Sequence, residues 1–252
     1  MAVQDPVLYN DWWVYLRDMI RSPWGSVHLN PSDLQIHNAY KMRSALQAQG
    51  YCAKALAGVI GSAQHESGLT TGAIQRTSVF PQGAETLAEC TNATMEQYYT
   101  ADPGADWGLG LLQWDRKSSI SPFCHVIVST AIRQNMLWYD GDLQMYRLEL
   151  EYTTDGTYHF WANNYGPDLT WAVFKDIENS RFSHYDAGEC AAVWDACWER
   201  SSGAGREIKR DNANFWYQYF IDHPLPPVPP LKPSIICSII NKRKVIKSVY
   251  YS

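Results

Sequence analysis

The sequence lacks several features that would place it in common protein classes. Its 252 residues contain no run of about 18 apolar residues, so we expect no membrane span. The first residues contain no basic segment followed by an apolar one, so we expect no signal peptide. The formal net charge is only −5 and no strongly basic stretch dominates, which argues against nucleic acid as a partner.

Cysteine is sparse and familiar catalytic motifs are missing. The six cysteines include no Cys-x-x-Cys pair, and Cys190 and Cys197 are too far apart on one predicted helix to form a bridge, so free thiols are expected. His65 and Glu66 do not begin a zinc motif, because Leu69 stands where the second histidine would be required. No nucleophile elbow or phosphate-binding glycine loop occurs either. We therefore expect no metal ion and no cofactor.

Aromatic residues and helical patterns are what the chain has in abundance. The 11 tryptophans and 16 tyrosines suit a core, a carbohydrate site or a protein interface. Apolar spacing and capping residues predict helices over 33–48, up to 67, 142–152, 170–177, 186–197 and 206–221. Residues 70–106 show no clear periodicity and are predicted to form an irregular binding loop. These elements indicate a single, mainly helical domain.

Glu66 stands at the end of the most informative helix. Leu56, Val59, Ile60 and Ala63 recur at helical spacing and predict a buried face, while Gly68 predicts the end of the helix. Glu66 would then lie at the rim of the core and at the negative end of the helix dipole. Both disfavour its anionic form and favour the protonated form that a general acid requires. A solvated glutamate at a frayed helix end is the alternative.

A second conspicuous stretch spans residues 106–115, which read DWGLGLLQWD. Two glycines around a compact apolar run predict a tight strand or turn where a ligand can approach the backbone. Gln113 offers a hydrogen-bond donor and an acceptor. The rings of Trp107 and Trp114 would suit stacking on sugar faces, and core packing is the alternative for each.

The chain changes character near both ends. Residues 1–30 are predicted to form an N-terminal extension, and residues 31–222 to form the domain. Residues 223–252 begin with a proline-rich spacer, which favours a semi-rigid polyproline II conformation, and continue as a β-prone tail. Such a tail is too small to fold alone, so we expect it to add strands to a partner protein or to fold back on its own domain.

Two of these segments together resemble a known family. Residues 64–68 (QHESG), followed by residues 108–114 (GLGLLQW), resemble the phage tail lysozyme family and are similar to parts of goose-type lysozymes and lytic transglycosylases. The resemblance extends over residues 33–222 and includes the aromatic-rich last helix. It implies a mainly α, lysozyme-like α+β fold in which a small β-hairpin or strand lip borders the cleft.

The resemblance also implies an activity and site residues. The expected reaction is cleavage of the β-1,4 bond between N-acetylmuramic acid and N-acetylglucosamine in peptidoglycan, with Glu66 as the acid. Asp115 and Asp106 are the candidates for a second carboxylate, with Asp115 slightly favoured. Trp107, Gly110, Gln113 and Trp114 would bind the glycan strand. Some relatives use the acid alone and release an anhydro sugar, so hydrolysis and transglycosylation both stay open.

The resemblance finally implies a place of action. A lysozyme carried in a virion reaches the wall from outside the cell, delivered by the phage tail, and residues 223–252 would then anchor it to other tail proteins. The competing hypothesis is a structural or adaptor tail protein with an inert lysozyme-like fold. The presence of Glu66 favours the enzyme.

Overall fold

A computed structural model describes residues 33–74, 89–101, 108–114, 126–161 and 165–224. This part of the chain is mainly helical and contains eight α-helices, together with a 3₁₀ turn at Ile177–Asn179 and a π-helical turn at Asp195–Glu199. The α-helices are α1 (Asp33–Ala48), α2 (Ala53–Ser67), α3 (Asn92–Ala101), α4 (Val126–Gln134), α5 (Gly141–His159), α6 (Trp171–Lys175), α7 (Ala187–Trp194) and α8 (Arg206–Asp222). The predicted mainly α fold is therefore confirmed.

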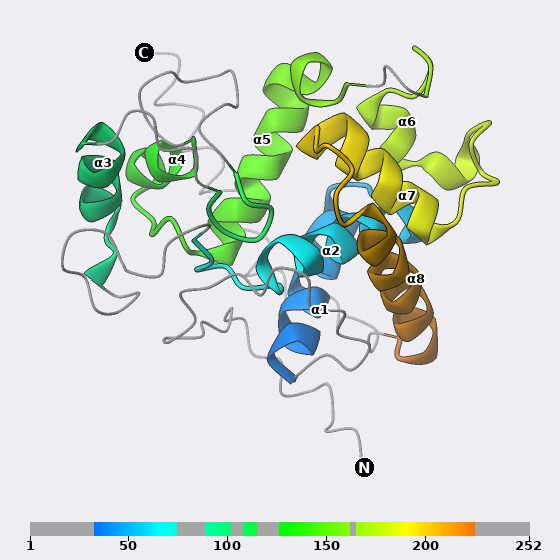
Figure 1. The fold of residues 1–252 in the computed structure, drawn as a ribbon, viewed down its shortest axis with the longest axis horizontal. Coiled ribbons are helices and arrows are strands. Elements are labelled where there is room, and N and C mark those ends of the chain that lie inside the picture. The colour runs from blue at the N-terminus through cyan, green and yellow to red at the C-terminus, as the bar shows by residue number, and fades with distance from the viewer. Residues whose placement is uncertain (1–32, 75–88, 102–107, 115–125, 162–164, 225–252) are drawn as a thin grey trace, which may run out of the picture.

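Helix α2 lies in the middle of the domain. It packs most extensively against α8 and α7, which lie on one side of it, while α3 and α4 lie at the opposite end of the molecule beyond α5 (Figure 1). Nearly the whole of α2 is buried rather than one face only. Between Ala55 and Ala63 every residue of α2 except Ser62 is apolar or glycine, so this stretch suits the interior, and the other polar residues of α2 lie at its two ends.

Two glycines allow α2 to approach its neighbours closely. A Cβ atom added at Gly61 would lie 2.5 Å from the backbone nitrogen of Ala213 on α8. One added at Gly58 would lie 2.8 Å from the backbone carbon of Cys190 on α7. Only a residue without a side chain fits at either position. The α2–α7–α8 packing therefore depends on glycines that lower the intrinsic helix propensity of α2 by about 1 kcal/mol each.

Residues predicted from the sequence to start or end helices do so in the structure. Asp186 and Glu189 form a reciprocal capping box at the start of α7. Thr170 accepts a hydrogen bond from the backbone N–H of Val173 and caps α6. Gly68 adopts the left-handed conformation with φ of 63° and ends α2. Side-chain caps thus fix the starts of α6 and α7, and a left-handed glycine fixes the end of α2.

The irregular region was predicted less well. Residues 70–106 were expected to lack regular structure, but α3 lies within them. Its side chains anchor it non-locally: Asn92 donates to the carbonyl of Met136 and accepts from the backbone N–H of Trp138, and the indole of Trp138 donates to the carbonyl of Cys90. Tertiary contacts of this kind stabilise a short helix whose own periodicity is weak.

The expected β-hairpin lip is reduced to a tight turn. The described residues contain two isolated antiparallel bridges, Ile74 with Leu109 and Leu109 with Trp114, and no longer strand. The four cysteines within the described ranges, namely Cys52, Cys90, Cys190 and Cys197, are free thiols, as expected. No helix among the described residues combines the length and apolar character that crossing a membrane requires. The N-terminal extension (1–30) and nearly all of the tail (225–252) lie outside the described residues.

We predict that Gly61→Ala destabilises the protein although alanine is the better helix former. The added methyl group would meet backbone atoms of Ala213, so α8 must move away, and overpacking of this kind costs about 1–3 kcal/mol. Chemical denaturation of the purified protein measures the effect.

Ser62→Ala is the matched control in the same helix. Ser62 is fully buried, and its Oγ has no hydrogen-bond partner among the described residues, so its removal should leave stability unchanged or raise it. Equal stability of Gly61→Ala and the unmodified protein would contradict the close approach of α2 and α8.

Candidate active site

Glu66 occupies the last turn of α2, and the chain that follows it is firmly held. Its side chain is 18% exposed, so it lies at the rim of the core as predicted. From α1, the amide of Asn38 donates to the carbonyl of Leu69 at 2.8 Å and that of Gln35 donates to the carbonyl of Gly68 at 3.3 Å. On the other side, the indole of Trp216 donates to the side chain of Gln64 at 2.8 Å. The end of α2 is thus fixed from two directions.

A buried ammonium group contacts Glu66. Lys209 of α8 has a side chain with no solvent exposure, and its Nζ lies 2.7 Å from Oε1 of Glu66. The same nitrogen lies 2.7 Å from Oδ1 of Asp195 and also contacts Oε2 of Glu199. Three carboxylates from two different parts of the chain therefore surround one cation. We call Glu66, Asp195, Glu199 and Lys209 the Lys209 cluster.

The partners of Asp195 keep that carboxylate ionised. Arg206 lies 3.0 Å from its Oδ2, and the hydroxyl of Ser201 donates to its Oδ1 at 2.6 Å. Burial raises the pKa of Asp195, but Lys209, Ser201 and Arg206 outweigh this effect and hold the pKa below its ordinary value.

The other two buried members of the cluster have shifts in the opposite direction. Burial raises the pKa of Glu199 to about 8, against the opposing effect of Lys209 and with additional repulsion from Glu66 and Asp195. Burial alone would lower the pKa of Lys209, but its three carboxylate partners raise it above the ordinary value. The cluster therefore contains a permanent ammonium and a carboxyl group that takes up a proton near neutral pH.

His65 lies beside the cluster. Burial and the charge of Lys209 hold the pKa of His65 below its ordinary value, despite the opposing charge of Glu66, so the ring is neutral at neutral pH. Gly205, at the start of α8, adopts φ of 78° and lies so close that a Cβ atom there would collide with the imidazole ring. Packing against Gly205 thus fixes the imidazole next to Glu66.

The second predicted segment, residues 108–114, lies next to the chain that follows Glu66. The backbone N–H of Gly110 donates to the carbonyl of Ala73 at 2.8 Å, and Leu109 pairs with Ile74. Gly110 has φ of 74°, and a Cβ atom there would lie 2.5 Å from the side-chain nitrogen of Gln144. The turn was predicted correctly, but Gly110 serves close packing against Gln144 of α5 in this structure.

Gln113 is at a strained position in that turn. Its φ of 50° lies in the left-handed region, which costs a residue with a side chain roughly 1 kcal/mol or more. Its amide nitrogen donates to the carbonyl of Gly110 at 2.8 Å. Its Oε1 is buried and has no hydrogen-bond partner among the described residues.

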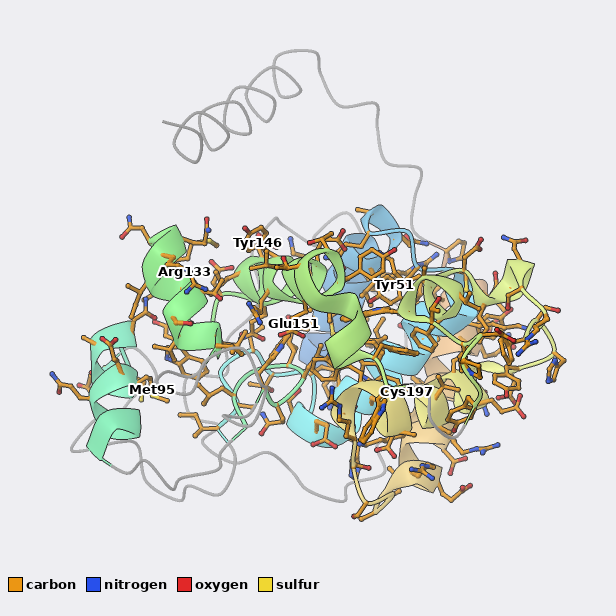
Figure 2. The ribbon with its side chains drawn as sticks, turned by 90° about the horizontal axis from the view of Figure 1, so that it is seen from above. Tyr51, Met95, Arg133, Tyr146, Glu151 and Cys197 are labelled. Carbon is orange, nitrogen blue, oxygen red and sulfur yellow. The ribbon has the colours of Figure 1, made fainter. Side chains whose placement is uncertain are left out.

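Trp114 fits the core-packing alternative rather than the sugar-stacking one. Its ring is 2% exposed, and its indole nitrogen donates to Oε1 of Glu151 at 2.9 Å. Glu151 also contacts Arg147 at 2.9 Å and accepts from Trp198 at 3.2 Å. Glu151 lies on the inner face of α5, whereas Tyr146 lies on its outer face (Figure 2). An indole buried in this way has no free face for a sugar.

The remaining predicted site residues, Asp106, Trp107 and Asp115, lie outside the described residues. Within the described part of the chain, no group of three or more His, Cys, Asp or Glu side chains is arranged to hold a metal ion.

The sequence analysis did not identify Lys209, Asp195 or Glu199, although a signal for Lys209 exists. Lys209 shares a helical face with Ala213, Trp216 and Phe220, all of them buried. A lysine in register with buried apolar residues requires a negatively charged partner. The partners were less accessible to prediction, because the π-helical turn that carries them has no recognisable sequence pattern.

Comparison with known proteins adds one finding. A family model described as phage tail lysozyme matches residues 37–220. This range is well over half of the chain and includes Glu66, the turn at 108–114 and the whole Lys209 cluster. No curated protein matches the chain.

Proposed function

Because the chain belongs to the phage tail lysozyme family, we propose that it cleaves the β-1,4 bond between N-acetylmuramic acid and N-acetylglucosamine in peptidoglycan. The family supports lysozyme-like chemistry and a phage-tail protein in general terms. The particular bond, the reacting residues and the role in cell entry are our proposal.

The observation that supports this proposal best is the position of Glu66. It is a partly exposed carboxyl group at the end of a buried helix, with its backbone fixed from both sides. A glycosidic oxygen is a poor leaving group unless it receives a proton as the bond breaks. A positioned carboxylic acid that supplies this proton accelerates such a reaction by about 10²–10⁴-fold. Glu66 is the residue to which we assign this role.

The glycan strand would bind along residues 108–114, the turn that lies beside the chain following Glu66. Residues 69–74 join Glu66 to the point where residues 108–114 attach. We propose that Gln113 positions the substrate and that Trp107 stacks on a sugar ring. Gly110 would then shape this surface and Trp114 would support it from the interior.

We predict that Glu66→Gln removes at least roughly 100-fold of the wall-cleaving activity, because an amide cannot donate the proton. The measurement is release of soluble fragments from purified peptidoglycan, with circular dichroism and thermal unfolding as tests of the fold. Glu207→Gln changes an exposed glutamate of α8 and should leave activity unchanged. Near-normal digestion by Glu66→Gln would show that Glu66 is not the acid.

Mass analysis of the products separates hydrolysis from transglycosylation. Hydrolysis gives reducing ends, and a second carboxylate should then be required, so Asp115→Asn or Asp106→Asn should lower the rate strongly. Transglycosylation gives 1,6-anhydro ends and leaves both variants active. Intact peptidoglycan with the unmodified protein would favour the structural or adaptor function instead.

We also propose that the tail anchors the enzyme to other proteins of the phage tail. Helix α8 ends at Asp222, but the following residue still belongs to the packed domain. The hydroxyl of Tyr40 donates to the carbonyl of His223 at 2.7 Å, and the ring of His223 stacks on Tyr219 at 4.2 Å. The anchor would therefore begin after Pro224.

We predict that deletion of residues 225–252 preserves peptidoglycan cleavage by the isolated protein but prevents its incorporation into phage particles. Ordering a free tail costs roughly 1–2 kcal/mol per residue, which a partner surface would offset. The two measurements are digestion of peptidoglycan and the protein content of purified particles. Normal incorporation would contradict the anchor, and loss of cleavage would indicate that the tail completes the domain.

A further inference from the structure

A buried carboxylate joins the turn at 108–114 to the π-helical turn Asp195–Glu199. Glu151 of α5 is 1% exposed. Its Oε1 accepts from the indole of Trp114 at 2.9 Å, and its Oε2 accepts from the indole of Trp198 at 3.2 Å. The two rings also meet edge to face, with centroids 5.9 Å apart. Because Trp114 belongs to the first turn and Trp198 to the second, one side chain holds both turns together.

The contact with Trp114 leads to the chain that follows Glu66. Trp114 and Leu109 exchange two backbone hydrogen bonds of 3.0 Å, and Leu109 forms an antiparallel bridge with Ile74. Gln113, to which we assign the positioning of the substrate, directly precedes Trp114 in the chain. The place of Trp114 therefore sets where Gln113 lies relative to the end of α2.

The contact with Trp198 leads to Glu66 itself. The ring of Trp198 stacks on that of Trp194 at 4.8 Å, and the next residue in the chain is Glu199. Oε2 of Glu199 contacts Nζ of Lys209, and this nitrogen lies 2.7 Å from Oε1 of Glu66. The place of Trp198 therefore affects the group that supports Glu66.

Stability alone does not account for an ion pair between these two turns. Arg147 lies 2.9 Å from Glu151, and the two side chains are only 4% and 1% exposed. Burial raises the pKa of Glu151 to about 7, although Arg147 and both indoles oppose the rise. A well-packed apolar pair of similar size is often at least as stable as a buried ion pair. What the carboxylate adds is geometry, because its two oxygens only accept hydrogen bonds and can hold two indoles at once.

We propose that Glu151 is a positioning residue, which sets the spacing between the turn at 108–114 and the acid Glu66. The inference rests on the proposed function, in which Glu66 protonates the glycosidic oxygen and Gln113 holds the glycan strand. A displacement of about 1 Å between groups that must align can lower a reaction rate by roughly 100-fold. Glu151 is buried away from the glycan and acts only through the two indoles.

Glu151→Gln in the full chain keeps the size of the side chain but replaces one acceptor oxygen with an NH₂ donor. The remaining oxygen is expected at the Oε1 position, where Arg147 and Trp114 both donate, so the contact with Trp198 is lost. We expect kcat on soluble peptidoglycan fragments to fall at least roughly 10-fold while KM stays within about threefold. The assay temperature is one at which circular dichroism shows the variant to be folded.

Trp198→Phe completes a double-mutant cycle with Glu151→Gln. It removes the indole N–H but keeps an aromatic ring against Trp194, and it should lower kcat by a similar factor. The double variant should lose no more activity than either single variant, because both changes break the same contact. Full kcat in folded Trp198→Phe, or losses that multiply in the double variant, would overturn the inference.

Tyr51→Phe is the matched control elsewhere in the core. The hydroxyl of Tyr51 accepts from the indole of Trp171 at 2.8 Å, so this variant also removes the acceptor of a buried indole. Neither residue belongs to the turn at 108–114 or to the Lys209 cluster, so stability should fall and kcat should not. An equal fall in kcat for Tyr51→Phe, or a Glu151→Gln variant that loses stability alone, would show a structural role and overturn the inference.

NMR of nitrogen-15-labelled protein tests the contact without reference to activity. The indole N–H resonance of Trp198, assigned by its loss in Trp198→Phe, should shift in Glu151→Gln, and an unchanged resonance would overturn the inference. Failure of the proposed function would look different, since the unmodified protein would not cleave peptidoglycan or Glu66→Gln would remain active.

Discussion

The buried ammonium of Lys209 is the interaction on which the candidate site depends. Lys209 is completely buried, so its charge is tolerated only because carboxylates surround it. These carboxylates come from the end of α2 and from the π-helical turn after α7, while Lys209 itself comes from α8. The contact of Gly61 with Ala213 brings α2 and α8 close enough for the ammonium to reach Glu66. The Lys209 cluster therefore depends on the glycine contact between α2 and α8.

The π-helical turn explains how two acidic side chains reach the same cation. Asp195 and Glu199 lie at the two ends of this turn, and both contact Nζ of Lys209. Turns of this kind occur often at functional sites, because an extra residue in the helix redirects side chains. The backbone here departs from a continuous α-helix, and Arg206 and Ser201 both bond to the buried carboxylate of Asp195.

Much of the helical framework could be predicted from the sequence because its causes are local. The capping box of Asp186 and Glu189 and the left-handed Gly68 mark helix ends through nearby atoms alone. The position of Glu66 at the end of α2 was predicted by the same local reasoning.

Helix α3 and the burial of Trp114 could not be predicted in this way, because they depend on hydrogen bonds to Met136, Trp138 and Glu151, far away in the chain. Lys209 shows the same limit, since its three partners are defined only by the folded structure.

The most direct test of this account is the pH dependence of unfolding for Lys209→Met. Without the ammonium, the three carboxylates repel one another, so their protonation is favoured in the folded state. Stability should then be retained in acid and lost as the pH rises, with a deficit of about 3–5 kcal/mol at pH 8 that shrinks at pH 5. Lys175→Met is the matched control, since Lys175 is also buried but has one carboxylate partner among the described residues, Glu149, at 3.5 Å. A deficit for Lys209→Met that is equal at both pH values, or no larger than that of Lys175→Met, would contradict the central role of the Lys209 cluster.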